Sequence, residues 1–253
     1  TGQTAPMRRD EWQVWAPTLG PSAHVVAYGH WGTPVLMIPS ERGSAYDIEN
    51  NGIIHALAPA IEAGQLKVYA VDANDGASWS NNSIPSEERA RNHDAYHAWI
   101  TDRVAPAIHG DCGGWVPIVS SGVSMGAYHA VNLALRRADL FPHAVGLSGN
   151  YDPSTWHPWG EMGDALYFNN PLAYVPNLYG EHLEWLRSRV FVQLAVGSGA
   201  FEEHPTAALQ SSWALAQALW DKGIGCNLDV WGTDTPHDWP SWQRMAVKHL
   251  THL

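Results

Sequence analysis

Short apolar runs, often rich in β-branched residues, recur along the whole chain, and they limit what it can fold into more than any other feature. Two opening runs, at 11–17 and 22–30, are separated by a Thr-Leu-Gly-Pro turn and predict a hairpin of antiparallel strands. Six later runs are short and largely apolar, which is typical of strands buried on both faces. They lie at 34–39, 66–72, 115–121, 143–149, 190–197 and 226–232. Pro117 fits a central strand poorly.

Stretches with a helical pattern of apolar residues lie between these runs. They cover residues 47–63, a segment that begins at Ser86, the segment after Gly126, and residues 209–220. Strands that alternate with helices predict an α/β fold, with one mostly parallel, eight-stranded sheet and helices on both faces. No linker interrupts the pattern, so we expect a single domain over 1–253.

Residues 151–188 break this alternation between two expected strands. The segment is rich in Pro, Asn and aromatic residues, and it is too long for an ordinary connection. We interpret it as a cap inserted over the carboxyl end of the sheet. The alternative is a surface excursion that packs on the body of the domain.

The charge balance bears on partners and location. With 14 basic and 25 acidic residues, the net charge is −11, whereas nucleic acids and anionic membranes favour basic surfaces. No apolar run approaches the roughly 18 residues of a membrane span. Cys112 and Cys226 lack neighbours at metal-ligand spacing and are interpreted as free thiols, so we expect no metal site. The N-terminal residues lack an apolar signal core, which favours the cytoplasm over a secreted form whose signal has been removed. The oligomeric state stays open.

The segment Gly122-Val123-Ser124-Met125-Gly126 is the strongest candidate for chemistry. Ser124 follows a buried apolar run and precedes an amphipathic helical stretch, which is the strand–turn–helix context of a nucleophile elbow. Glycines two residues away on each side leave room for neighbouring backbone at such a sharp turn. We therefore predict that Ser124 is a nucleophile, the alternative being a tight turn without chemistry.

A serine hydroxyl needs a general base, and His237 is the best placed of the 14 histidines. It follows the last expected strand by six residues, at the sheet edge where the elbow should lie. The alternative is a surface histidine that caps the final helix. His129, by contrast, lies on the helix after Ser124, so its side chain should point away from the hydroxyl.

A carboxylate should orient this histidine and stabilise its cation. In chain order it should follow the seventh expected strand, where Glu202 and Glu203 occur without an Asp. We favour Glu202, with Glu203 as the alternative and Asp234 as a third possibility.

The oxyanion of an acyl-transfer intermediate needs two backbone N–H groups aimed at one point. Met125, directly after the serine, should supply one of them. The other should come from the loop after the third strand, where Glu41 is preferred and Ser40 and Arg42 are alternatives. Arg42 could instead reach a substrate anion or form a surface ion pair.

Several segments of the chain resemble the putative esterase family of α/β-hydrolases, which includes esterase D, feruloyl esterases and mycolyltransferases. They are the elbow GVSMGAYHA, the following LFPHAVGLSGNYDPS and the terminal HDWPSWQRM, in which His237, Trp239 and Trp242 have a distinctive spacing. The similarity runs from about Glu11 to the C-terminus. It implies an α/β-hydrolase fold, Ser124 as nucleophile, His237 as base and a carboxylate within GSGAFEEHP as the acid.

The sequence thus predicts a serine esterase that acts on small-molecule or polymeric esters and needs no cofactor. Aromatic residues near the expected pocket suit an aromatic, acyl or polyester substrate. The candidates for its wall are Trp79, Trp156, Trp159, Tyr167 and Phe168. An acyltransferase with the same triad and an alcohol acceptor is the first alternative. A non-catalytic binding protein on the hydrolase fold is the second.

Overall fold

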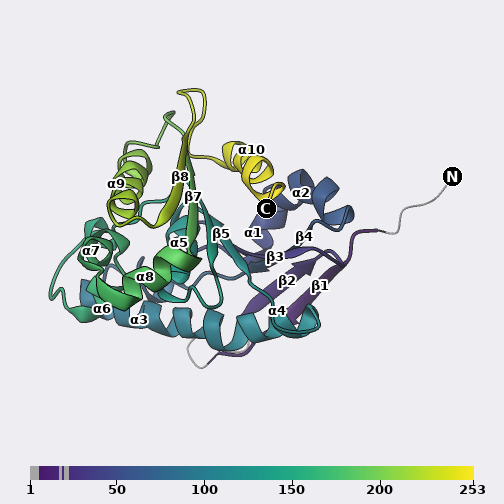
Figure 1. Ribbon diagram of the computed structural model, residues 1–253, viewed down its shortest axis with the longest axis horizontal. Coiled ribbons are helices and arrows are strands. Elements are labelled where there is room, and N and C mark those ends of the chain that lie inside the picture. The colour runs from purple at the N-terminus through teal and green to yellow at the C-terminus, as the bar shows by residue number, and fades with distance from the viewer. Residues whose placement is uncertain (1–5, 17–18, 20–22) are drawn as a thin grey trace.

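All eight expected strands form one sheet in the computed structural model, which describes residues 6–16, 19 and 23–253 (Figure 1). The strand order is β1-β2-β4-β3-β5-β6-β7-β8. Only the pairings of β2 with β1 and with β4 are antiparallel. The strands are β1 (Arg9–Gln13), β2 (His24–Tyr28), β3 (Thr33–Ile38), β4 (Leu66–Val71), β5 (Val119–Val123), β6 (His143–Leu147), β7 (Phe191–Val196) and β8 (Gly225–Val230).

One strand prediction differs in detail from the structure, and one predicted turn falls where the structure describes little. Strand β5 begins at Val119, so Pro117 precedes it and leaves the ladder of a central strand undisturbed. The turn expected at 18–21 falls largely outside the described residues.

Helices cover both faces of the sheet, as the alternating pattern predicted (Figure 1). One apolar core lies between the sheet and α1, α2 and α10, and the other between the sheet and α3, α4, α5 and α9. The helices are α1 (Ala45–Asn50), α2 (Ile53–Glu62), α3 (Ser86–Trp99), α4 (Ala105–Asp111), α5 (Met125–Arg136), α6 (Asp164–Phe168), α7 (Pro171–Tyr174), α8 (Gly180–Arg189), α9 (Ala208–Asp221) and α10 (Trp239–Leu250). The helix expected over 47–63 is divided at Gly52, whose φ of 84° is left-handed.

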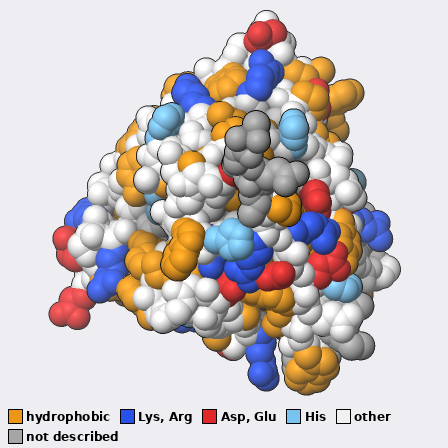
Figure 2. All heavy atoms as spheres, turned by 90° about the vertical axis from the view of Figure 1, so that its right-hand side faces the viewer, with side chains coloured by type: hydrophobic (Ala, Val, Ile, Leu, Met, Phe, Trp, Pro, Cys, Tyr) orange, Lys and Arg blue, Asp and Glu red, His pale blue; other side chains and the backbone are white. Residues whose placement is uncertain are grey.

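The edge strand β1 carries charged side chains that are paired with their neighbours. Arg9 lies 2.8 Å from Glu11 and 2.8 Å from Glu49, while Arg8 lies 2.7 Å from Asp111. Figure 2 looks onto this side of the molecule, where acidic and basic side chains lie next to one another. Such charges discourage an edge strand from pairing with another chain. No helix of the described residues is both long and apolar enough to cross a membrane.

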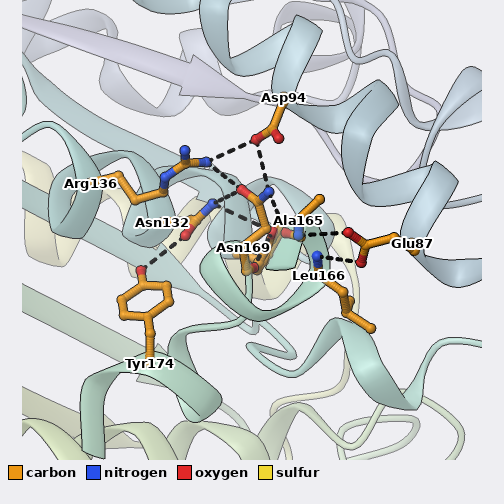
Figure 3. Close-up of polar contacts among 9 residues, drawn as sticks. Glu87, Asp94, Asn132, Arg136, Ala165, Leu166, Asn169 and Tyr174 are labelled. Atoms are coloured by element: carbon orange, nitrogen blue, oxygen red, sulfur yellow. Dashed lines mark hydrogen bonds and ion pairs between the residues drawn. The ribbon is translucent and has the colours of Figure 1, made fainter. Parts of the chain in front are cut away.

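The segment 151–188 forms α6, α7 and α8, which pack beside α3 and α9 (Figure 1). Its attachment begins at Glu87 on α3. The Glu87 carboxylate accepts hydrogen bonds from the backbone N–H groups of Gly163 (2.8 Å), Ala165 (2.7 Å) and Leu166 (3.0 Å). Figure 3 shows the last two of these bonds at the start of α6. Burial raises the pKa of Glu87, but these N–H groups outweigh burial and hold the pKa below its usual range.

Asn169 provides the second attachment, at the end of α6 (Figure 3). Its amide accepts a hydrogen bond from Asn132 on α5 at 3.1 Å and donates one to Asp94 on α3 at 2.9 Å. Tyr174 donates to Asn132 at 2.9 Å. These contacts attach the segment to α3 and α5, beside the sheet. That the segment caps the carboxyl end of the sheet stays a prediction.

Candidate active site

Ser124 occupies the sharp turn between the central strand β5 and helix α5, with a φ of 55°. That left-handed conformation is strained for a serine and is characteristic of a nucleophile elbow. The two neighbouring glycines are required by space: a Cβ on Gly122 would lie 2.2 Å from the carbonyl oxygen of Gly126, and a Cβ on Gly126 would lie 2.3 Å from that of Ile38. The turn therefore presents the Ser124 side chain at the carboxyl edge of the sheet.

His237 lies in the loop between β8 and α10, and its ring meets the serine. The distance from Ser124 Oγ to His237 Nε2 is 2.8 Å, which is hydrogen-bond distance. The His237 N–H donates to the carbonyl of Ala200 at 2.9 Å, which joins the loops after β7 and β8. Its ring packs edge-on against Trp242, with the centroids 5.0 Å apart. The His-x-Trp-x-x-Trp spacing noted in the sequence thus supplies a packing partner for the imidazole.

Glu202 lies behind the histidine, in the loop after β7. Its Oε2 is 3.2 Å from His237 Nδ1, and its side chain is fully buried. Oε1 accepts hydrogen bonds from the Ser148 hydroxyl at 2.6 Å and from the Gly197 N–H at 3.3 Å. A buried carboxylate is stable only with such partners, so these contacts fix the acid in place.

The two alternative acids lie elsewhere. The side chains of Glu203 and Asp234 are both exposed. Among the hydrogen bonds of the described residues, neither carboxylate is joined to His237. Of the three candidates, only Glu202 is brought to the imidazole in this structure.

The loop after β3 forms a turn at Ser40–Gly43, where the Gly43 N–H donates to the Ser40 carbonyl at 3.0 Å. The Arg42 N–H donates to Oδ2 of Asp75 at 3.0 Å, so it is engaged away from the serine. Glu41 and Met125 both line the cavity that contains Ser124, whereas Ser40 does not. As the first residue of α5, Met125 has an N–H without an acceptor inside the helix.

This cavity has a volume of about 480 Å³ and is open to solvent. Trp79 and Trp156 form an aromatic wall, with their rings edge to face and 5.5 Å between centroids. The remaining lining is largely polar and includes Asn82, Asn150, Thr155, His157 and Thr206.

The structure places three of the five expected pocket aromatics away from the cavity. Trp159 is outside the lining, and its indole N–H donates to the carbonyl of Asn82. Tyr167 and Phe168 border a separate groove beside α6. The prediction was wrong for these residues because Glu87 and Asn169 fix the segment in an orientation that turns them outward.

Ser148 and Asp75 are the site residues that sequence reasoning missed. Ser148 follows β6 with a φ of 56°, and the only available signal was its position at the end of an apolar run. Asp75 belongs to a loop for which no role was predicted. In the described part of the chain, no group of three or more His, Cys, Asp and Glu side chains is placed to hold a metal ion.

A strained serine after the central strand of a mostly parallel, eight-stranded sheet defines the α/β-hydrolase class. The putative esterase family matches residues 43–252, most of the chain, and the chain belongs to this family. The resemblance noted in the sequence is thereby confirmed, and the protein is a hydrolase that acts on carboxylic esters.

Solved structures with similar folds span nearly the whole chain. An S-formylglutathione hydrolase from Agrobacterium tumefaciens has a TM-score of 0.74 at 16% identity, over 99% of this chain and 96% of that chain. A ferulic acid esterase has a TM-score of 0.72 at 16% identity, over 97% of both chains. A fluorophosphonate-binding serine hydrolase from Staphylococcus aureus has a TM-score of 0.68 at 15% identity, over 98% of both chains. At these identities the likeness shows the fold. A sequence comparison with curated proteins gives no match.

Proposed function

We propose that the protein hydrolyses carboxylic esters through an acyl-enzyme on Ser124, with His237 as general base and Glu202 as the orienting acid. One observation carries this proposal: Ser124 Oγ, the imidazole and the buried carboxylate form a continuous hydrogen-bonded series at 2.8 and 3.2 Å. This order of contacts allows the imidazole to take the serine proton while the carboxylate stabilises the resulting cation.

In the first half of the reaction, Ser124 Oγ attacks the ester carbonyl carbon as Nε2 of His237 takes the hydroxyl proton. The C–O bond to the alcohol then breaks, and His237 returns that proton to the leaving oxygen. In the second half, His237 deprotonates a water molecule that attacks the acyl-enzyme. The bond between Ser124 Oγ and the acyl carbon then breaks, His237 returns the proton to Oγ, and the acid leaves.

The negative charge that develops on the carbonyl oxygen needs preorganised donors. We assign the N–H of Met125 as one donor and that of Glu41 as the other. The Glu41 assignment rests on two facts: Glu41 lines the cavity, and the N–H of Arg42 is engaged by Asp75. Each such donor contributes on the order of 10²–10³ to kcat in serine hydrolases.

The cavity suits an ester with one flat apolar part and one polar part. Trp79 and Trp156 can pack against an aromatic or broad acyl group, and the Asn and Thr side chains of the same lining can bind hydroxyl groups. Among the structural relatives, this pattern favours a substrate like that of the ferulic acid esterase over one like that of the S-formylglutathione hydrolase. Trp156→Ala should then raise KM for aromatic acyl esters more than for acetyl esters.

The same polar lining favours an acyltransferase as the second candidate. Side chains such as Asn82, Asn150 and Thr206 could hold a hydroxylated acceptor that competes with water for the acyl-enzyme. Product analysis with and without added alcohol distinguishes the two. Ester products that rise with alcohol concentration, at the expense of the free acid, indicate transfer.

Fluorophosphonate labelling followed by peptide mapping tests the mechanism directly. The native protein should be labelled on Ser124, and Ser124→Ala and His237→Ala should not be labelled. Ser121→Ala is the matched control, since Ser121 lies on the same strand and its hydroxyl is bonded to the carbonyl of Val145. A native protein without label, or with label at another residue, would refute the assignment and favour a binding protein on this fold.

A further inference from the structure

Arg89, on α3, carries a buried guanidinium that no carboxylate compensates. It is 1% exposed and forms no ion pair with any residue that the structure describes, and the remaining residues of the chain include no Asp or Glu. Burial lowers the pKa of the guanidinium, which still stays protonated at neutral pH. A buried charge without a counter-charge is costly, so its role must lie in what its N–H groups hold.

All three hydrogen bonds of the Arg89 side chain go to backbone carbonyls. Nε donates to Ile84 at 2.9 Å, while the two terminal nitrogens donate to Trp156 at 2.8 Å and to His157 at 3.0 Å. Among the described residues, no other donor reaches the last two carbonyls. The planar fork of an arginine holds two neighbouring acceptors in fixed positions, which the single ammonium of a lysine does not. Arg89 therefore fixes the backbone at 156–157 to α3.

The backbone at His157 requires such support. Its φ of 46° lies in the left-handed region, which residues other than glycine seldom adopt. Conformations of this kind persist only where the surrounding contacts over-determine them, and they cluster at binding and active sites. The two carbonyls that Arg89 holds lie on either side of the His157 Cα, so the strained residue is fixed from both sides.

The fixed stretch forms part of the wall of the cavity that contains Ser124. Trp156 and His157 both line this cavity. The Trp156 ring packs edge to face against Trp79, at 5.5 Å between centroids, and against Tyr128, at 5.0 Å. Tyr128 belongs to α5, the helix that begins directly after Ser124. Arg89 thus places the backbone of this wall, and the neighbouring rings orient its indole.

We propose that Arg89 is a positioning residue for substrate selection, which holds the Trp156 indole where a flat acyl group can pack against it. The inference rests on the proposed function, because it concerns how the same cavity selects its ester. Arg89 does not line the cavity, so it acts only through the two residues that it holds. A purely structural attachment would affect all esters alike, whereas a positioning role affects aromatic acyl esters selectively.

Arg89→Met tests this role, because methionine keeps an apolar stem and removes every donor. The ratio of kcat/KM for a cinnamate ester to kcat/KM for the acetate ester of the same alcohol should fall at least about tenfold. The fall should arise mainly from a higher KM for the cinnamate ester. Active sites are counted by fluorophosphonate titration, so that an unfolded fraction does not enter the constants.

Arg89→Lys keeps the charge but cannot hold both carbonyls, so its ratio should lie between those of the native protein and Arg89→Met. A fall of at least about threefold is expected. This variant carries the test if Arg89→Met yields too few labelled sites.

Glu87→Gln is the matched control for attachment. It weakens another contact between α3 and the same segment, at the start of α6 rather than at the cavity wall. It should lower stability yet leave the ratio of the two esters within about twofold of the native value. Arg91→Met, at an exposed position of the same helix, controls for the loss of a positive charge and should also leave the ratio within about twofold.

A double variant shows whether Arg89 acts through the indole. Trp156→Ala and Arg89→Met should each lower the ratio, and together they should lower it little more than the larger single loss, because no positioned ring remains to be affected. The Ki of phenylboronic acid, which forms a tetrahedral adduct with the serine, should rise in the same pattern. The Ki of methylboronic acid should change less than about threefold.

Three results would overturn the positioning role: equal losses for the cinnamate and acetate esters, an equal fall of the ratio in Glu87→Gln, or additive effects of the Arg89 and Trp156 substitutions. The proposed function fails independently, if fluorophosphonate does not label Ser124 in the native protein. A labelled native protein in which Arg89→Met loses activity without selectivity refutes only the inference about Arg89.

Discussion

The hydroxyl of Ser148 donates a hydrogen bond to Oε1 of Glu202 at 2.6 Å, so the buried carboxylate is held on the side opposite His237 as well. Ser148 follows β6, and Glu202 follows the neighbouring strand β7. The orientation of the acid is thus set by the adjacent strand as well as by its own loop.

Ser148→Ala should lower the free energy of unfolding by about 1.5–3 kcal/mol, the range for a hydrogen bond to a charged group. It should also reduce kcat, because one oxygen of the carboxylate loses its strongest partner. Denaturant unfolding and steady-state kinetics measure the two effects. Ser212→Ala is the matched control: its buried hydroxyl has no hydrogen-bond partner among the described residues. Equal losses of unfolding free energy and of kcat in the two variants would contradict the prediction.

Glu202→Gln should lower kcat by roughly 10²–10⁴, since an amide neither stabilises the imidazolium nor fixes its tautomer as a carboxylate does. Glu203→Gln changes an exposed neighbour and should leave kcat within about twofold, as surface substitutions usually do. Measurement of kcat at a saturating ester concentration distinguishes the effects of the two substitutions. A larger loss in the Glu203 variant would show that the wrong glutamate has been assigned.

Gly126→Ala should destabilise the protein by roughly 1–3 kcal/mol or more and abolish labelling of Ser124, because the added methyl group would collide with backbone at the end of β3. Gly110→Ala on α4 is the control, since a Cβ there meets nothing within 4 Å. That substitution should be neutral or stabilising by up to about 1 kcal/mol, as for glycine in a helix. Thermal unfolding of both variants gives the comparison, and a native-like Gly126→Ala would argue against the close approach.

Glu87→Gln should destabilise the protein by about 1–3 kcal/mol at pH 7, because the amide places a donor against backbone N–H groups. The pKa of Glu87 is lower in the folded than in the unfolded protein, so its stabilisation is complete above the unfolded pKa of about 4.3. It is then lost as the pH falls through the folded pKa.

The difference in melting temperature between native protein and Glu87→Gln should therefore shrink when the pH is lowered from 7 to below 4. Glu88→Gln, at the exposed neighbouring position, should show no comparable difference at either pH. A pH-independent difference for the Glu87 variant would mean that the carboxylate charge contributes nothing.

The strands could be predicted because each is a short apolar run, and their order along the chain places the segments of Ser124, Glu202 and His237 at one edge of the sheet. The choice between Glu202 and Glu203 as the acid needed the structure. Which of two adjacent side chains is buried depends on the path of the loop after β7. The second oxyanion donor left no trace in the sequence, since a backbone N–H has no side-chain signature.

The pocket aromatics were the weakest sequence prediction. Trp156 lines the cavity, yet Tyr167 and Phe168, only a short distance further along the chain, do not. The difference arises from hydrogen bonds that Glu87 and Asn169 make across long sequence separations. Local patterns of hydrophobicity carry no information about such contacts.

The segment 151–188 enters between β6 and β7, whereas the residues assigned to the reaction follow β3, β5, β7 and β8. Its only contribution to the cavity is the stretch Thr155 to His157, and side chains of α3 and α5 anchor the rest from the side. One part of the cavity wall is consequently encoded apart from Ser124, Glu202 and His237, while Trp79, Asn82, Asn150 and Thr206 of the same wall lie outside this segment. Replacement of the one surface segment would alter a single side of the cavity and leave the bond-breaking residues unchanged.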